Sequence, residues 1–495
     1  MRIDLHSKSE GAMPVSQTRT ERDSMGEMQV PTDALYGATT ARAVENFPIA
    51  KRPVPADVIH AFGHLKAACA IANQELGKLD AKRADAIVRA SDDVAAGKYD
   101  DQFPVDVYQT GSGTSTNMNA NEVIANLANK ALGLGAGAKV ADGAVHPNDH
   151  VNMGQSSNDT FPTAMCIAAA AGTERLVIAL HRLEAELQNK ATEWDKIVKV
   201  GRTHLMDATP IRMGQVFSGF VRQANLGAVR AKVASTSLHH NMPIGGTAVG
   251  TGINTHPDFA RRVCETLSKR VYAGQNSPPQ FKEAVDHCEA QAAKDSFVEA
   301  HGHLKTIAVS LSKIASDIRL LGSGPRCGIG ELILPAIQPG SSIMPGKENP
   351  VIAESMMQVA CRVIGNDAVV TTAGMGGVGS LFELNVAMPV MIDAFIESTT
   401  LLTNVCHVFV DKLLLGLKVN EQRCSDLVEQ SLMNITSLAP KIGYDNAAQV
   451  AKRAMKENKT IRQIVRELGL MDDAELTRLL DFDAMTRPTT EAGGG

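Results

Sequence analysis

Two long stretches of this chain repeat large aliphatic residues every three or four positions. In 174–192, leucines recur at intervals of four, three and four residues, and in 297–321 leucine and isoleucine keep the same rhythm until Gly322. This spacing places the aliphatic side chains on one face of a helix. The second stretch runs back to about Phe281, interrupted only by Gly302, which predicts a helix of about 40 residues and about 60 Å. Helices of that length indicate a coiled coil or an elongated bundle.

The composition agrees with helices packed on helices. Aromatic residues make up 4% of the 495 residues, with one Trp, while Met is frequent at 20. An aliphatic core of this kind favours close helix packing over sheets. We therefore expect a mainly α protein. Changes in composition predict a flexible N-terminal tail over 1–23, an N-terminal domain over 24–154, a central helical bundle over 155–416 and a small C-terminal domain over 417–495.

Charge and hydropathy argue against several classes of partner. The net charge is −5 and dense Lys/Arg runs are lacking, so a nucleic-acid partner is not expected. The apolar run at 164–172 is too short to span a bilayer, and residues 1–23 lack the apolar segment of a secretory signal. Eight cysteines are scattered without a C-x-x-C pair, which is typical of reduced thiols and predicts a cytoplasmic protein.

Four polar segments stand out between the aliphatic ones. They are TGSGTSTNMNANE (110–122), GQSSNDTFPT (154–163), GRTHLMDATP (201–210) and GSSIMPGKENP (340–350). Each is rich in Ser, Thr, Asn and Gly and precedes a helical pattern, so each could simply cap a helix. Pro210 and Pro350 stand where first helical residues are expected. If several such helix starts converge, however, their free N–H groups, hydroxyls and amides form a site for an anion such as a dicarboxylate.

Three residues in or just after these segments are candidates for proton chemistry. His204 lies inside a polar segment rather than on an apolar face, although a lone histidine is more often structural. Glu354 follows in the next helix and could orient a histidine. Ser341 could act as a base only where N–H donors and a cation stabilise its alkoxide.

The segment GSSIMPGKENP resembles the G-S-S-x-M-P-x-K-x-N-P signature of the fumarase/aspartase superfamily. The segments QTGSGTSTNMNANEVIAN, HPNDHVNMGQSSNDTFPTAM, GRTHLMDATP and GGTAVGTGINTHP match that superfamily in order and spacing, from about Arg19 to Pro488. Within it, the chain looks most like the class II fumarate hydratases, which interconvert fumarate and (S)-malate in the tricarboxylic acid cycle. The resemblance implies a three-domain lyase fold, no metal and no cofactor. It also implies a homotetramer with a 20-helix core and active sites shared by three subunits.

The resemblance also carries over site residues. Its catalytic serine falls on Ser341, and its second acid/base falls on His204, paired with Glu354. The positions that would bind the substrate carboxylates are Ser112, Gly113, Thr114, Ser156, Ser157, Asn158, Thr203, Ser342, Lys347 and Asn349. A second dicarboxylate site would fall on His146, Pro147, Asn148 and Asp149.

This sequence departs from the family pattern at two positions. The family often has a basic residue three positions before the histidine of the second site, and this chain has Gly143 there. The sequence therefore does not decide whether this chain has the second site. Glu348 replaces a small apolar residue beside the predicted anion site. The enzymatic alternative is aspartate ammonia-lyase, which typically carries Gln at the position of His204. A second alternative is a catalytically silent structural protein such as a lens crystallin, against which the presence of all the catalytic residues argues.

Overall fold

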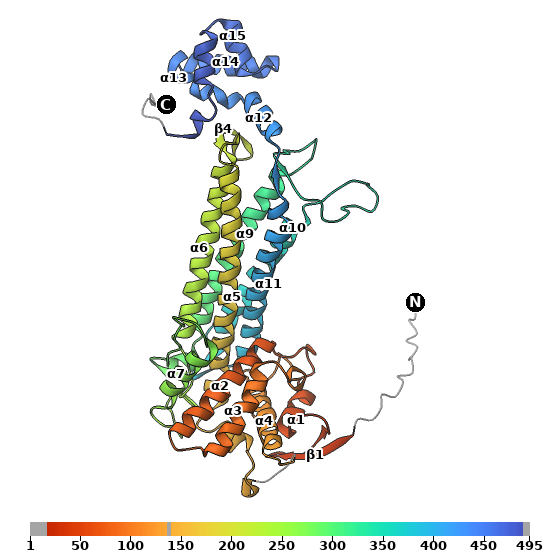
Figure 1. Ribbon diagram of the computed structural model, residues 1–495, viewed down its shortest axis with the longest axis vertical. Helices are drawn as coiled ribbons and strands as arrows, with labels where there is room; N and C mark the ends of the chain where they lie inside the picture. Colours follow the sequence, from red (N-terminus) through yellow and green to blue (C-terminus); the bar gives the residue numbers. More distant parts are fainter. Residues whose placement is uncertain (1–16, 136–139, 489–495) are drawn as a thin grey trace. The chain divides into compact units, whose positions relative to one another are not determined.

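The computed structural model describes residues 17–135 and 140–488 and is mainly helical, as predicted (Figure 1). The chain divides into two compact units. Of the described residues, unit 1 holds those up to 173, with 233–302 and 366–397, and unit 2 holds 174–232, 303–365 and those from 398 to 488. The boundaries fall inside five long helices, so the three-domain division expected from composition stays a prediction.

Unit 1 is built on a hairpin and a group of medium-length helices. Its elements are β1 (Thr18–Asp23), β2 (Gly26–Pro31), α1 (Ala38–Asn46), α2 (Ala56–Glu75), α3 (Ala81–Ala95), α4 (Thr114–Ala131), η3 (Pro147–Val151), α7 (Phe259–Val271) and α8 (His287–Ala292). Helix α2 packs against α3 and α7 and buries most of its side chains. A Cβ at Gly63 would lie 2.5 Å from the backbone nitrogen of Ala95, so only glycine allows α2 and α3 to approach this closely.

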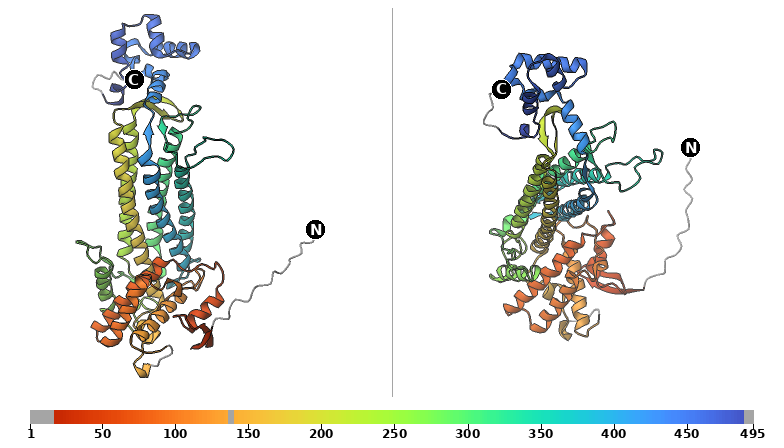
Figure 2. Two further views of the ribbon diagram at one scale, coloured as in Figure 1. Left: turned by 45° about the vertical axis from the view of Figure 1, so that its right-hand side comes forward. Right: turned by 45° about the horizontal axis from the view of Figure 1, so that its top comes forward.

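Five helices pass from one unit into the other. They are α5 (Ser157–Glu193), α6 (Met213–His239), α9 (Asp295–Leu321), α10 (Val351–Gly374) and α11 (Met388–Lys412). Their segments in unit 2 run side by side (Figures 1 and 2). Among the described residues, α5 is the one helix long and apolar enough to cross a membrane, and 72% of its most apolar stretch is buried inside the protein.

Unit 2 also contains short strands and a C-terminal helical cluster. The strands are β3 (Val198–Thr203) with β4 (Met206–Arg212), and β5 (Leu332–Ile333) with β8 (Lys418–Val419). The helices are α12 (Glu421–Gln430), α13 (Ala439–Ile442), α14 (Tyr444–Glu457), α15 (Ile461–Leu468) and α16 (Asp473–Leu479). The last of them close over a small aliphatic core that includes Leu438, Val450 and Leu476. A third short pair, β6 (Ser380–Leu381) with β7 (Leu384–Asn385), belongs to unit 1.

The prediction of a helix of about 40 residues from Phe281 onward is wrong at the N-terminal end of that helix. The chain forms α8, then turns at Ala293 and begins α9 only at Asp295. The turn is held by Lys294, whose buried ammonium donates to the backbone oxygens of Gln291 (3.0 Å), Ala293 (3.1 Å) and Ala290. This side chain satisfies carbonyl groups that a continuing helix would have used. Gly302, in contrast, lies inside α9 without interrupting it.

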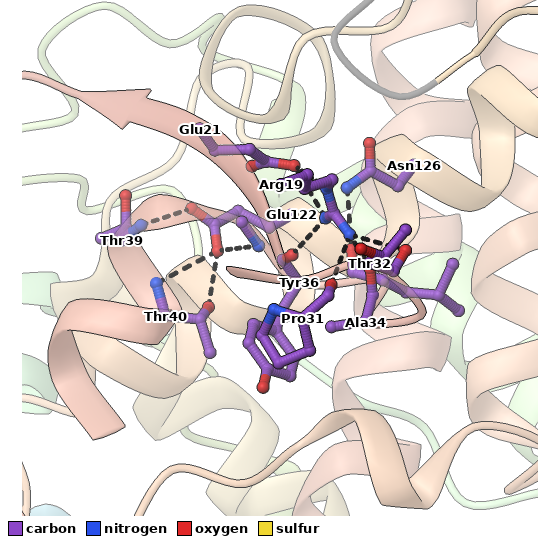
Figure 3. Close-up of polar contacts among 12 residues, drawn as sticks. Arg19, Glu21, Pro31, Thr32, Ala34, Tyr36, Thr39, Thr40, Glu122 and Asn126 are labelled. Atoms are coloured by element: carbon purple, nitrogen blue, oxygen red, sulfur yellow. Dashed lines mark hydrogen bonds and ion pairs between the residues drawn. The ribbon is translucent and has the colours of Figure 1, made fainter. Parts of the chain in front are cut away.

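The prediction of a flexible tail over 1–23 is also wrong for residues 18–23. These residues form β1 and pair antiparallel with β2. Residues 1–16 lie outside the described part of the chain. Arg19 on β1 anchors this hairpin (Figure 3). Its guanidinium lies 2.7 Å from Glu21 and donates to the backbone oxygens of Pro31, Thr32, Ala34 and Tyr36 at 2.8–3.1 Å. One side chain thus fixes the path of the chain from β2 to α1.

A buried carboxylate completes the same region. Glu122 on α4 accepts hydrogen bonds from the backbone nitrogens of Gly37, Thr39 and Thr40 at 2.9–3.2 Å, and from the Thr40 hydroxyl at 2.6 Å (Figure 3). The N-cap residue Gly37 has no side chain to bind these donors. Glu122 therefore caps α1 from a neighbouring helix.

We predict that Arg19→Met lowers the thermal stability and exposes the segment around 17–36 to proteolysis. Losing the donor to four carbonyl oxygens costs about 1–3 kcal/mol. Arg22→Met is the matched control, because Arg22 lies on the same strand with an exposed side chain. The measurement is the melting temperature together with limited proteolysis. Equal behaviour of the two variants would show that the guanidinium does not hold the hairpin.

Candidate active site

Two of the four polar segments meet in unit 1. The Thr114 hydroxyl lies 2.7 Å from the hydroxyl of Ser112 and 2.7 Å from that of Ser157. Because α4 begins at Thr114 and α5 at Ser157, these contacts bring two helix N-termini together. We call Ser112, Thr114 and Ser157 the hydroxyl cluster. The convergence of helix starts that an anion site requires is therefore present for this pair of segments.

The turn before α4 is one that only glycine can form. Gly113 has a φ of +71°, and a Cβ there would lie 2.1 Å from the ring of Phe161 on α5. Gly111 approaches the backbone oxygen of Val386 so closely that a Cβ would lie 1.7 Å from it. The glycines of the TGSG segment therefore let α4 begin directly against α5.

A buried aspartate holds the start of α5 in place. Asp159 accepts hydrogen bonds from the backbone nitrogens of Ser156 (2.9 Å), Gly245 (3.1 Å) and Thr247 (2.9 Å). Burial raises the pKa of Asp159 to about 6, against the opposing effect of these N–H donors. The neighbouring Asn158 donates from its side chain to the backbone oxygen of Ala248 at 2.8 Å. The 245–248 segment is thereby attached to the first turn of α5.

This arrangement suits a carboxylate group. Helix N-termini present free N–H groups and the positive end of the helix dipole. Hydroxyl groups add neutral donors, and Thr114, Ser156 and Ser157 are partly exposed. The site therefore offers an anion several donors with little positive charge on its surface.

A buried lysine that the sequence analysis did not identify lies beside this pair of helix starts. Lys66 on α2 is fully buried and donates to the side-chain oxygens of Asn117 (2.8 Å), Asn152 (3.0 Å) and Gln155 (2.9 Å). Burial lowers the pKa of Lys66 to about 8. The available signal was a single lysine inside the apolar run HLKAACAIAN, since lysines are almost never fully buried without a partner.

The 201–210 segment differs from expectation, because it forms a β-hairpin. Pro210 lies in β4 rather than at a helix start, and α6 begins at Met213. Thr203 pairs with Met206 across a two-residue turn made by His204 and Leu205, at φ values of +56° and +62°. Such turns normally use Asn-Gly, so two side-chain-bearing residues in this conformation indicate strain at this turn.

The turn presents His204 outward. Leu205 and Met206 beside it are 78% and 69% exposed. Within residues 17–135 and 140–488, the His204 side chain forms no hydrogen bond or ion pair. Its imidazole is therefore available to a group outside this chain.

A buried ion cluster anchors the hairpin at its base. Glu331, just before β5, is 0% exposed and lies 3.1 Å from the Lys199 ammonium and 3.0 Å from the Arg202 guanidinium. Burial lowers the pKa of Lys199, although Glu331 opposes this effect. Glu331 therefore connects β3, which leads into the His204 turn, to the segment that leads toward Ser341.

The segment from 340 to 350, here called the serine loop, closes on itself. The backbone nitrogen of Gly340 donates to the backbone oxygen of Lys347 at 2.8 Å, and the Asn349 amide donates to the backbone oxygen of Gly340 at 2.8 Å. The Ser341 hydroxyl accepts from the backbone nitrogens of Ile343 (3.3 Å) and Met344 (3.1 Å). Hydrogen bonds of this kind stabilise negative charge on the oxygen.

The other predicted residues of the serine loop lie at its surface. Ser342 and Lys347 are exposed, and Ile343 is 83% exposed. Helix α10 begins at Val351, one residue later than predicted, and the Asn349 side chain closes the loop instead of capping the helix. Glu354 stands in the first turn of α10 and is partly buried. Among the described residues Glu354 forms no hydrogen bond with His204, and their pairing stays a prediction.

The second dicarboxylate site suggested by the sequence forms a turn of its own. The Nδ1 atom of His146 accepts from the backbone nitrogen of Asp149 at 3.2 Å, and the backbone nitrogen of His146 donates to Nδ1 of His150 at 2.8 Å. Pro147 begins the short helix η3, and Asn148 and Asp149 are exposed. Burial lowers the pKa of His150, and Arg83 adds to that effect. Binding of a ligand at this turn stays a prediction.

Within the described residues, there is no group of three or more His, Cys, Asp and Glu side chains that could hold a metal ion.

Family comparisons identify the lineage of the chain. The family model described as lyase matches residues 26–365, and the model described as the fumarase C C-terminus matches residues 435–487. Fumarate hydratase class II from Corynebacterium glutamicum is 50% identical over 97% of this chain and 98% of its own length. The protein of that name from Mycobacterium tuberculosis is 50% identical over 95% of this chain and 96% of its own length.

Solved structures show the same fold. The class II fumarase of Schistosoma mansoni has a TM-score of 0.88 and 36% identity, covering 95% of this chain and 99% of that one. The cobalt-bound fumarate lyase:delta crystallin of Brucella melitensis has a TM-score of 0.89 and 40% identity, covering 95% of this chain and 100% of that one.

We predict that Glu331→Gln destabilises unit 2 strongly, because it leaves Lys199 and Arg202 without their buried counter-charge. Breaking a buried ion pair costs about 3–5 kcal/mol. Glu429→Gln is the matched control, since Glu429 pairs with Arg462 at 3.0 Å with both side chains partly exposed, and such pairs contribute about 0–1 kcal/mol. Differential scanning calorimetry compares the two variants. A Glu331→Gln protein as stable as the control would contradict the anchoring role.

Proposed function

This chain belongs to the class II fumarate hydratase family and catalyses the hydration of fumarate, and we propose that the hydroxyl cluster, the His204 turn and the serine loop form its active site. The observation that carries the proposal is the meeting of Ser112, Thr114 and Ser157 at two helix N-termini. Fumarate and (S)-malate are dianions, and each carboxylate needs several donors. The helix starts supply these donors.

Unit 1 would bind one carboxylate of the substrate. The donors are the hydroxyls and backbone nitrogens at the two helix starts, contributed by Ser112, Gly113, Thr114, Ser156, Ser157 and Asn158. The serine loop would bind the rest of the substrate through Ser342, Lys347 and Asn349, and Thr203 would contribute from the hairpin. Neutral donors dominate in this set, with Lys347 as its one cation.

Ser341 would remove the proton from the carbon next to one carboxylate of malate. The N–H groups of Ile343 and Met344 already point at its oxygen, and they would stabilise the alkoxide form. Loss of the proton turns the adjacent carboxylate into a dianion, which the converging donors stabilise more than the ground state. His204 then protonates the leaving hydroxyl, or takes a proton from water during hydration. Glu354 would fix the orientation of that imidazole.

We further propose a homotetramer in which three subunits contribute to each active site. The apolar residues at the two catalytic positions support this arrangement. Leu205 and Met206 at the turn, and Ile343 in the serine loop, are exposed in the single chain at 78%, 69% and 83%. Apolar side chains beside a reacting group gain stability when a neighbouring subunit covers them. The assembly would have a mass of about 210 kDa, four times the 52.6 kDa chain.

Aspartate ammonia-lyase activity is not favoured, because relatives about 50% identical over nearly the whole chain are named class II fumarate hydratases. A cytoplasmic location is part of the proposal. It is supported by the eight cysteines, which are all unpaired, as expected in a reducing compartment.

We predict that Ser341→Ala lowers kcat by about 10²–10⁴-fold, the usual contribution of a positioned base, while KM changes little. Ser342→Ala is the comparison, since loss of a binding hydroxyl raises KM more than it lowers kcat. Initial rates are followed by the ultraviolet absorbance of fumarate. Near-normal kcat in Ser341→Ala would exclude this serine as the base.

Mixing two inactive variants tests the shared active site. Ser341→Ala and His204→Asn subunits, dissociated together and reassembled, form hybrids in which one subunit supplies an intact serine and another an intact histidine. About a quarter of the sites are then complete if the two residues come from different subunits. Each variant reassembled alone is the control. No recovered activity in hybrids of confirmed mass would contradict the sharing of the site.

A further inference from the structure

Lys66 lies beside the two helix starts, and the proposed reaction assigns it no role. It sits in α2, fully buried, with its ammonium bound to three amide oxygens. Within the described residues, no carboxylate forms an ion pair with this ammonium. A buried cation without a paired carboxylate is unfavourable and calls for a compensating function.

The three acceptors belong to the segments that begin the two helices. Asn117 lies in the first turn of α4, three residues after Thr114, whereas Asn152 and Gln155 precede the start of α5. Asn117 also accepts from the hydroxyl of Thr160 on α5 at 3.0 Å. The ammonium therefore joins the two helix starts on their buried side, as the hydroxyl cluster joins them on the exposed side.

Positive charge accumulates in this region. Two helix N-termini each carry a partial positive charge, and Lys66 adds a full one. The titratable groups that act on Lys66 are Cys69 on its own helix and Asp159 on α5, while α4 and the 152–155 segment present only neutral amides. Asp159 is already bound by three backbone N–H groups. An anion at the hydroxyl cluster would offset the remaining charge.

We propose that Lys66 is a positioning residue that fixes the two helix starts and supplies positive charge behind the dicarboxylate site at Ser112, Thr114 and Ser157. The inference rests on the proposed function, because it assumes that a substrate carboxylate binds at the hydroxyl cluster. In other anion sites exposed arginines attract the anion. In this proposal the buried Lys66 attracts it.

The proposal implies a pH dependence with a definite sign. Burial lowers the pKa of Lys66 to about 8, so the ammonium is present below that pH and is lost above it. A bound dianion favours the charged form and raises the pKa. The affinity for dicarboxylates therefore falls as the pH rises through about 8, and binding at that pH draws a proton from solution.

The first experiment compares Lys66→Met with Lys294→Met. Lys294 is a matched control, because it is equally buried, bonds to three neutral oxygens and has its pKa lowered to about 8 by burial, but it caps α8. We expect KM for malate to rise at least about tenfold in Lys66→Met, the effect of losing one buried attractive charge, with a smaller change in kcat. Lys294→Met should keep its KM. In wild type kcat/KM should fall above about pH 8, and in Lys66→Met this fall should be absent.

A second measurement does not depend on the folding of Lys66→Met. Succinate, a dicarboxylate that cannot be hydrated, is titrated into the His204→Asn protein by calorimetry at pH 8 in two buffers of different ionisation enthalpy. We expect uptake of up to about half a proton per site, as for a group with a pKa near the working pH. The His204→Asn background removes the imidazole as a source of this signal.

The outcomes separate the inference from the proposed function. If succinate binds without proton uptake, or if a folded Lys66→Met keeps its KM, the role of Lys66 is wrong. If Ser157→Ala leaves both KM and succinate affinity unchanged, the dicarboxylate site itself is misplaced, and the proposed active site fails with it. Proton uptake combined with a raised KM in Lys66→Met, but not in Lys294→Met, supports both.

Discussion

The hydrogen bond between Thr114 and Ser157 marks the constraint on which the site depends, because it joins the N-termini of two helices that repel each other. Such a junction needs close packing and compensating charge. Glycine at position 113 provides the packing against Phe161. The carboxylate of Asp159 provides negative charge near the junction and holds the 245–248 segment. The resulting excess of donors is available to an anion.

The groups proposed for proton transfer are held differently. His204 and Ser341 stand on a tight turn and a surface loop rather than on helix starts, and a single buried carboxylate, Glu331, links the two supporting segments. The strain of the His204 turn is tolerated because the base of the hairpin is anchored by Lys199 and Arg202. Binding groups on helix ends and proton-transfer groups on a turn and a loop form a division of roles that agrees with catalysis by positioned groups.

Sequence periodicity predicted the long helices, and the polar segments predicted helix starts, because both depend on local patterns. The meeting of two of these starts in space depends on the fold and was given only as a condition for an anion site. The break before α9 could not be predicted, since it depends on the Lys294 ammonium reaching three backbone oxygens in the folded state. The hairpin at 201–210 was mistaken for a helix start because Thr-Pro has the same signature in both contexts. The sequence analysis placed Arg19 in a flexible tail. Its four carbonyl partners lie later in the chain, and only folding brings them to its guanidinium.

The use of neutral hydrogen-bond donors affects how tightly a reversible enzyme binds its substrate and product and how fast it releases them. A site built from surface arginines would bind both dianions tightly and release them slowly, since charge-assisted hydrogen bonds are about twice as strong as neutral ones. Hydroxyls, amides and helix N–H groups bind a carboxylate with less energy each, yet they are oriented before the substrate arrives. These donors then stabilise the charge that develops during proton removal more than they stabilise the bound substrate. The full positive charge of the unit 1 site is on Lys66, inside the protein. There it attracts the dicarboxylate without a direct contact that would delay the release of the product.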